Sequence, residues 1–161
     1  MADFQRAVDF VIEHEIRDDS GWTPHDPDDP GGRTRWGVAS RWHPNVDLDS
    51  LTRSGAEDFY RREFWVPLRG DDLPEPLGLV MLDWAVPHGV RTATRALQGV
   101  LGVYADGRIG QQTLAAVRAR DPKSLARQLI ATRKRAIQQI HSGKYEAGWL
   151  ARLVDVALAA L

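Results

Sequence analysis

The stretch Phe10-Val11-Ile12-Glu13-His14-Glu15 closes an amphipathic helix that the sequence predicts over residues 3–16. Val11 and Ile12 belong to an apolar stripe with the period of an α-helix. Glu15 falls on the same stripe, three residues after Ile12 and four after Val11. Burial penalises a charged carboxylate, so an acid that continues an apolar face is a candidate for a functional role. The whole stripe consists of Phe4, Ala7, Val8, Val11 and Ile12.

A polar segment over residues 17–32 follows this helix. Its prolines and glycines prevent regular secondary structure, and it carries the acids Asp26, Asp28 and Asp29. Such a spacing of acids is typical of calcium loops. However, the twelfth position counted from Asp26 is Gly37, where an EF-hand loop needs a bidentate acid. We therefore expect no metal here, and a short strand over residues 34–38 as one arm of a small β-hairpin.

The rest of the chain predicts helices separated by turns. Helical patterns cover residues 53–64, 77–86, 90–101, 113–118 and 122–141. The segment 77–86 is nearly all apolar apart from Asp83, so we expect a central buried helix that Pro87-His88-Gly89 ends. A final helix is expected to bury Trp149, Leu150, Leu153, Val154 and Leu158. The sequence thus predicts a single, mainly α-helical domain over residues 1–161, with at most a small hairpin.

The composition argues against several classes of protein. A net charge of −1 lacks the basic surplus of most nucleic-acid-binding proteins, and no basic recognition helix is present. The chain has no cysteine, which rules out disulfides, thiolate zinc sites and a cysteine nucleophile. No window approaches the roughly 20 apolar residues of a membrane span. The start of the chain lacks the basic and apolar regions of a signal peptide. We expect a monomer without stable membrane insertion and without a cofactor.

Glu15 lies where a glycosidase needs an acid. Glycoside hydrolysis requires a group that protonates the leaving oxygen, and often a second carboxylate that activates water. A carboxyl group held against apolar side chains retains its proton more readily than one in water. Glu15 sits at the end of a helix and faces an acidic loop, which suits that task. A capping role, or a salt bridge with Arg17 or Arg33, has equal weight from position alone.

Glu15, together with residues 26–38, resembles the signature of glycoside hydrolase family 108. That signature is a helix ending in Glu-Gly-Gly, followed by Asp-Pro-Gly-Gly-x-Thr-x-x-Gly. The resemblance implies a lysozyme-like helical fold and N-acetylmuramidase activity. It makes Glu15 the catalytic glutamate and gives Asp29 and Thr34 the role of holding the water that attacks the sugar.

This sequence departs from the family pattern beside the proposed acid. Ile16 and Arg17 stand where the family has two glycines, and the loop before Asp29 is longer here. Which of Asp26, Asp28 and Asp29 faces the substrate therefore remains open.

The resemblance continues to about residue 154. Leu97-Gln98-x-x-Leu101-Gly102 and Asp106-Gly107-x-Ile109-Gly110 look like a peptidoglycan-binding module, and residues 144–152 resemble the closing helix with its Gly-Trp-Leu-x-Arg block. The family resemblance thus implies a catalytic lobe over residues 1–90 and a peptidoglycan-binding-like helical lobe over residues 91–161. The Asp-Gly turn specifies a fold, and whether it also binds sugar stays open.

Several further residues are candidates for substrate binding. Val86-Pro87-His88-Gly89 replaces the family's Val-Asn-x-Gly, so His88 either substitutes for the lost amide or is an ordinary loop histidine. Aromatic rings stack on sugar faces, which makes Trp22, Trp36 and Trp42 candidates, with Trp36 favoured. Asp26 and Asp28 complete the predicted set.

The resemblance therefore implies a lysozyme that cuts the β-1,4 bond between N-acetylmuramic acid and N-acetylglucosamine. Its expected partner is bacterial peptidoglycan, and its expected setting is a phage endolysin made in the host cytoplasm and released through a membrane hole formed by a holin. The alternative is a non-catalytic peptidoglycan-binding or regulatory protein on the same fold. An amidase or peptidase is disfavoured, because the five histidines show no helical pairing for zinc.

Overall fold

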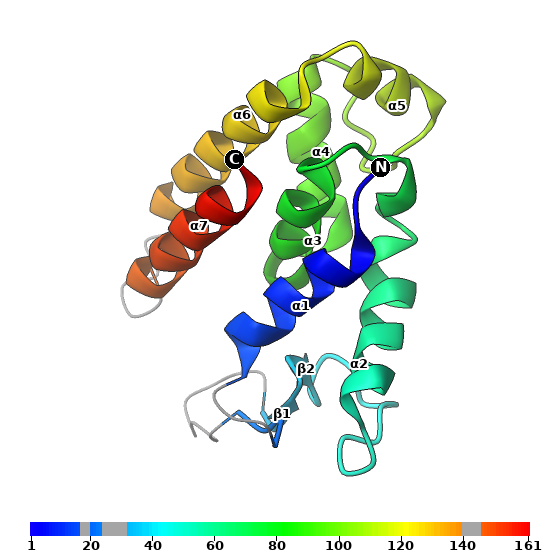
Figure 1. Cartoon of the computed structure of the whole chain (residues 1–161), viewed down its shortest axis with the longest axis vertical. Coiled ribbons are helices and arrows are strands. Elements are labelled where there is room, and N and C mark those ends of the chain that lie inside the picture. The colour runs from blue at the N-terminus through cyan, green and yellow to red at the C-terminus, as the bar shows by residue number, and fades with distance from the viewer. Residues whose placement is uncertain (17–19, 24–31, 140–145) are drawn as a thin grey trace.

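The computed structural model describes residues 1–16, 20–23, 32–139 and 146–161. The predicted mainly α-helical fold with a small hairpin is confirmed (Figure 1). The hairpin consists of β1 (Thr34–Arg35) and β2 (Val38–Ala39), and short π and 3-10 turns, Arg61–Trp65 and Gly70–Asp72, follow α2. The helices are α1 (Phe4–Glu15), α2 (Arg53–Tyr60), α3 (Leu77–His88), α4 (Val90–Leu101), α5 (Gln111–Arg118), α6 (Pro122–Gln139) and α7 (Glu146–Ala160).

Helix α1 forms where the amphipathic pattern predicts it. The side chain of Asp3 accepts hydrogen bonds from the backbone nitrogens of Gln5 and Arg6, which caps the helix N-terminus. The predicted stripe is buried, and the helix ends because Ile16 adopts an extended conformation. Glu15 is therefore the last helical residue, at the edge of the core.

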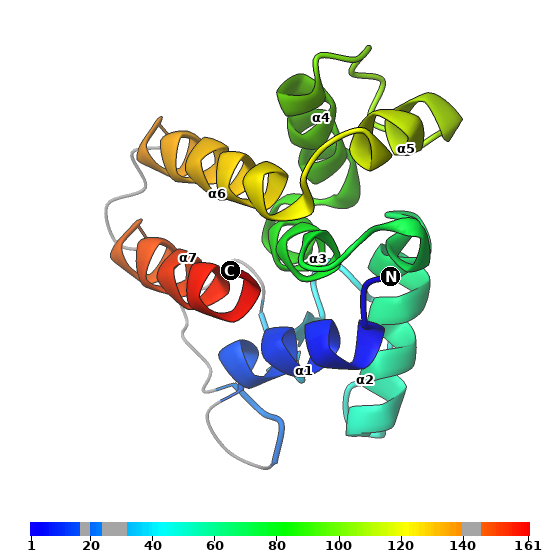
Figure 2. The same cartoon turned by 45° about the horizontal axis from the view of Figure 1, so that its top comes forward.

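Helix α3 is the centre of the molecule. Every residue from Leu77 to Ala85 is buried, because α1, α4, α6 and α7 all pack against this helix (Figure 2). The helix ends within the expected segment Pro87-His88-Gly89, but at His88, two residues beyond the predicted end at Val86. The chain turns at Gly89, whose positive φ of 85° is readily available to glycine.

The two strands of the hairpin are joined by a turn of two residues. Thr34 pairs with Ala39 and Arg35 with Val38, which leaves Trp36 and Gly37 as the loop. The expectation of one strand over residues 34–38 is therefore wrong, because this stretch includes the turn. Both loop residues have positive φ, 51° and 79°, as in a type I′ turn. Residues 21–23 lie alongside as a third segment, where the Trp36 nitrogen donates to the Gly21 carbonyl at 2.7 Å.

The last helix exposes part of the face that the sequence pattern assigned to the core. Leu153, Val156 and Ala160 are buried against the rest of the molecule, whereas Val154 and Leu158 are 57% and 79% exposed. The expectation for Val154 and Leu158 is wrong, because α7 packs on α3 and α6 along a different stripe of its apolar surface.

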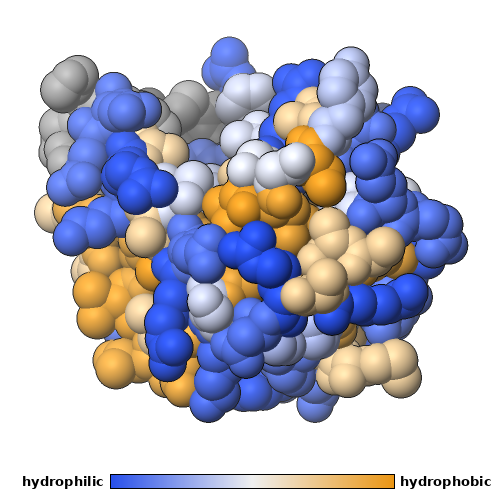
Figure 3. Space-filling view, turned by 90° about the horizontal axis from the view of Figure 1, so that it is seen from above, coloured by the Kyte–Doolittle hydropathy of each residue, from blue (hydrophilic) through white to orange (hydrophobic). Residues whose placement is uncertain are grey.

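The face seen from above mixes hydrophilic residues with apolar patches (Figure 3). Among the described residues, none of the helices has the length and hydropathy that crossing a bilayer requires.

Candidate active site

Glu15 lies at the boundary between core and solvent. Val11 and Ile12, one turn earlier, are fully buried, while the Glu15 side chain is 25% exposed. The Thr23 hydroxyl donates a hydrogen bond to the Glu15 backbone carbonyl at 3.0 Å. This bond ties the end of α1 to the segment beside the hairpin, so Glu15 has a fixed backbone and a side chain that a ligand can reach.

The hairpin turn packs directly against Glu15. A Cβ atom at Gly37 would lie 2.8 Å from Cγ of Glu15 and would also clash with the Tyr60 hydroxyl oxygen. The Tyr60 hydroxyl donates to the Trp36 carbonyl at 3.0 Å. Burial, followed by the nearby Glu15 charge, raises the pKa of Tyr60 well above its usual value. Tyr60 therefore remains a neutral donor that holds the turn beside Glu15.

The ion-pair partner of Glu15 is Arg152, from the opposite end of the chain. Nη1 of Arg152, on α7, contacts Oε1 of Glu15. The sequence suggests Arg17 or Arg33 as the salt-bridge partner of Glu15. Arg33 instead pairs with Asp49 at 2.5 Å, and Arg17 lies outside the described residues. Glu15 is thus ion-paired with Arg152, and not with Arg33.

Arg152 is itself held by a buried carboxylate. Its Nε donates to Oδ1 of Asp83 at 2.6 Å, and Arg133 contacts the other oxygen of Asp83. Asp83 is fully buried on α3, and the side chain of Arg133 is only 2% exposed. Burial disfavours the charged form of Arg152, but the charges of Asp83 and Glu15 outweigh it and raise the pKa of Arg152.

The cluster of Asp83, Arg133 and Arg152 was in part predictable from the sequence. Asp83 interrupts an apolar helix, and Arg133 occupies the buried stripe of α6 between Leu129 and Ile137. Arg152 ends the Gly-Trp-Leu-x-Arg block. Charged residues on buried faces of different helices are expected to pair with one another, and that rule would have linked them.

The other predicted catalytic residues divide into two groups. Asp26, Asp28 and Asp29 lie outside the described residues. Thr34 lies on β1, partly buried, and its backbone carbonyl accepts from the Thr23 nitrogen at 3.0 Å. Because Thr23 also bonds to the Glu15 backbone, Thr34 is connected to the acid through one residue.

Trp36 does not offer a ring face to a sugar. Its side chain is 8% exposed, and its Nε1 donates to the Leu51 carbonyl at 3.2 Å. The prediction that a sugar stacks on Trp36 is therefore wrong, because the Trp36 ring packs in the core. The guanidinium groups of Arg33 and Arg35 both lie over the Trp22 ring, 4.6 and 5.2 Å from its centroid. Trp42, by contrast, is 65% exposed, just beyond the hairpin.

His88 lies at the end of α3, partly buried against α7. Its ring meets that of Trp149 edge-on, with centroids 5.6 Å apart. Burial, followed by the charge of Arg133, lowers the pKa of His88. At neutral pH the ring is therefore uncharged, and it offers a hydrogen bond rather than a positive charge.

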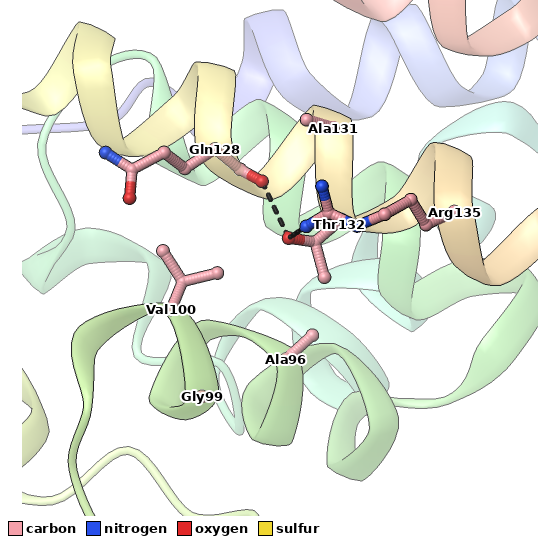
Figure 4. A pocket seen from close by; sticks show the side chains of 7 residues that line it. All are labelled: Ala96, Gly99, Val100, Gln128, Ala131, Thr132 and Arg135. Carbon is pink, nitrogen blue, oxygen red and sulfur yellow. Dashed lines mark hydrogen bonds between the residues drawn. The ribbon is translucent and has the colours of Figure 1, made fainter.

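A groove of about 500 Å³ lies between α4 and α6 (Figure 4). The α4 wall is formed by small or apolar residues, Ala96, Gly99 and Val100, and the α6 wall carries Gln128, Thr132 and Arg135. The Arg135 guanidinium donates to the Thr132 hydroxyl at 3.0 Å, which holds its charge at the groove. The groove is separate from Glu15 and consists of residues from α4 and α6 alone.

The chain matches known proteins over most of its length. Residues 8–89 match the family model described as glycosyl hydrolase 108. The chain belongs to the glycosyl hydrolase 108 family. Residues 92–154 of this family-108 hydrolase match a second model, described as a predicted peptidoglycan domain. The two matches identify a glycoside hydrolase that acts on peptidoglycan.

A solved structure supports the same assignment. SagA from Brucella abortus superposes with a TM-score of 0.84 at 33% identity, covering 98% of this chain and 94% of the SagA chain. No curated protein sequence matches the chain. Glu15 lies in the first matched region and Arg152 in the second, so the ion pair of the candidate acid joins the two regions.

Proposed function

We propose that this family-108 hydrolase is an N-acetylmuramidase that cuts the β-1,4 bond between N-acetylmuramic acid and N-acetylglucosamine. The observation that carries this proposal is the placement of Glu15. Its carboxyl group is partly exposed at the end of a buried helix, and Arg152 and the hairpin turn hold it in one position. That is the placement a proton donor to a glycosidic oxygen requires.

In the proposed reaction Glu15 is protonated when the glycan is bound, and it gives that proton to the leaving oxygen as the bond to the anomeric carbon breaks. This step returns Glu15 to the charged form that pairs with Arg152 in the structure, so the guanidinium favours release of the proton. By family resemblance, Asp29 and Thr34 hold the water that attacks the anomeric carbon, and the Asp29 carboxylate takes the proton that this water loses. Trp42 and His88 are proposed to contact the glycan, the former by stacking and the latter by a hydrogen bond.

The proposal is tested on purified peptidoglycan. The protein and Glu15→Gln are incubated with isolated sacculi, and the released fragments are identified by mass spectrometry. We expect new reducing muramic acid ends from the wild type and none from the variant. New reducing glucosamine ends would instead show that the enzyme is a glucosaminidase. Equal release by both proteins would show that Glu15 is not the proton donor.

A second candidate function is binding to peptidoglycan without cleavage. The match of residues 92–154 to a predicted peptidoglycan domain favours it, and the groove between α4 and α6 lies within that region. Sedimentation with sacculi separates the two functions. A binding protein sediments and releases nothing, and its binding does not change with Glu15→Gln. Arg135→Ala tests whether the groove takes part in binding.

We propose that the biological role is lysis of a bacterial host by a monomeric phage endolysin made in the cytoplasm. Peptidoglycan lies outside the cytoplasmic membrane, so such an enzyme needs a route across it. Expression in a bacterial host with and without a pore-forming holin tests this route. Lysis that needs the holin supports the proposal, and lysis without it contradicts the route.

A further inference from the structure

Asp83 is a buried acid that the hydrolysis chemistry above does not use. It lies on the central helix α3 with no exposed surface, and each of its oxygens contacts a different arginine. Oδ1 accepts from Nε of Arg152 at 2.6 Å, and Oδ2 contacts Nη1 of Arg133. Both oxygens therefore have guanidinium partners.

Arg152 bridges two carboxylates through one rigid group. Its Nε binds Asp83, while its Nη1 binds Glu15. Because a guanidinium is planar, fixing the direction of Nε also fixes the direction of Nη1. The position of Asp83 thus determines where Arg152 meets the Glu15 carboxylate.

The network is better suited to fixing geometry than to stabilising the fold. Its charges alternate in the order Glu15, Arg152, Asp83, Arg133, so each contact joins opposite charges. Buried ion pairs are costly to desolvate, and well-packed apolar residues often serve stability equally well. A buried ion pair instead holds its two side chains in one preferred orientation.

We propose that Asp83 is a positioning residue for hydrolysis, which acts on Glu15 through Arg152. The inference rests on the proposed role of Glu15 as proton donor. It also implies that the second matched region completes the catalytic site, because Arg152 belongs to that region.

A double-mutant cycle tests the proposal. Turnover of soluble glycan fragments is measured for the wild type, Asp83→Asn, Arg152→Met and the double variant. We expect Asp83→Asn to lower kcat by about 100-fold with KM within twofold, since displacement of a catalytic group by about 1 Å costs that much. In the Arg152→Met background the same change is expected to lower kcat no further.

Additive losses in the cycle would overturn the proposal, because they would show that Asp83 acts independently of Arg152. A folded Asp83→Asn variant with wild-type kcat would overturn it as well. Failure of the proposed function looks different, since the wild type itself would then release no fragments.

Two controls separate positioning from stability. Asp155→Asn changes another side-chain contact between α1 and α7, the 3.3 Å contact between Oδ2 of Asp155 and Nε2 of His14, and is expected to keep kcat within twofold of wild type. Circular dichroism and thermal melts establish that each variant folds. If Asp83→Asn fails to fold, the cycle is run with Asp83→Asn combined with Arg133→Met, which removes one buried charge of each sign.

Discussion

At the scale of single residues, Gly37 shows how closely the hairpin approaches the proposed acid. Its φ is 79°, and a methyl group there would meet both Glu15 and the Tyr60 hydroxyl. Gly37 is therefore required twice, once for its backbone conformation and once for its lack of a side chain.

We expect Gly37→Ala to lower the free energy of unfolding by about 1–3 kcal/mol through backbone strain, and to lower kcat by displacing Glu15. Urea denaturation and fragment turnover measure the two effects. Gly148→Ala is the control, because nothing lies within 4 Å of a Cβ at that exposed position of helix α7. It is expected to be neutral or slightly stabilising, and equal losses in both variants would contradict the argument.

Trp42 is the exposed aromatic residue that we expect to contact the glycan. Trp42→Ala should raise KM about threefold to tenfold, the range for loss of an aromatic contact, with unchanged thermal stability. Tyr104→Ala, at an 81% exposed aromatic residue between α4 and α5, is the control that should leave KM unchanged. An unchanged KM for Trp42→Ala would show that the glycan does not contact Trp42.

The candidate site was partly predictable from residues. The helical stripe identified Glu15, and its position at the end of α1 follows from the sequence pattern. Trp36 was misassigned, because an aromatic residue beside a glycine gives no indication of which side of the turn is buried. Arg152 was missed as a partner, since it is 137 residues away and depends on how α7 packs against α1.

At the scale of elements, Gln98 explains why the Asp106-Gly107 turn has its shape. The buried Gln98 amide donates to Asp106 at 2.7 Å and to the Arg108 carbonyl at 2.9 Å, and its oxygen accepts from the Gly107 nitrogen. This bonding, followed by the backbone bond from Arg108, lowers the pKa of Asp106. The motif therefore has a structural role in joining α4 to α5.

We expect Gln98→Ala to lower the free energy of unfolding by about 2–4 kcal/mol, because it leaves several buried polar groups without partners. Sedimentation with peptidoglycan at a temperature where the variant is folded should be unchanged. A loss of binding by the folded variant would show that the turn also contacts the wall polymer.

Helix boundaries were more predictable than helix orientation. The sequence placed α4 at its observed bounds, because Gly89 and Gly102 flank it. It assigned Val154 and Leu158 to the core, since α7 is apolar over more than one face and periodicity cannot choose between them. The choice depends on which side α3 and α6 occupy, and that is a tertiary property.

At the scale of the whole molecule, two partly buried histidines couple stability to pH. Burial lowers the pKa of His43, against the charge of Glu63, and burial with Arg133 lowers the pKa of His88. At these two histidines the unfolded chain therefore binds more protons than the folded protein as the pH falls through about 6.5, the ordinary pKa of histidine. By linkage, stability then falls as pH decreases.

We expect the free energy of unfolding to decrease from pH 7.5 to pH 5.5, and the double variant His43→Gln/His88→Gln to show a smaller decrease. Urea denaturation at both pH values measures the difference. An equal decrease in the variant would assign the pH dependence to other groups.

The contact between Glu15 and Arg152 also limits how new enzymes can arise from this family by recombination. A crossover between residues 89 and 92 would join the front half of one gene to the back half of another, and would separate the acid from its arginine. Such a hybrid would retain activity when the incoming half supplies an arginine at the same place on its last helix. The halves of this protein are therefore expected to be inherited together rather than exchanged as independent modules.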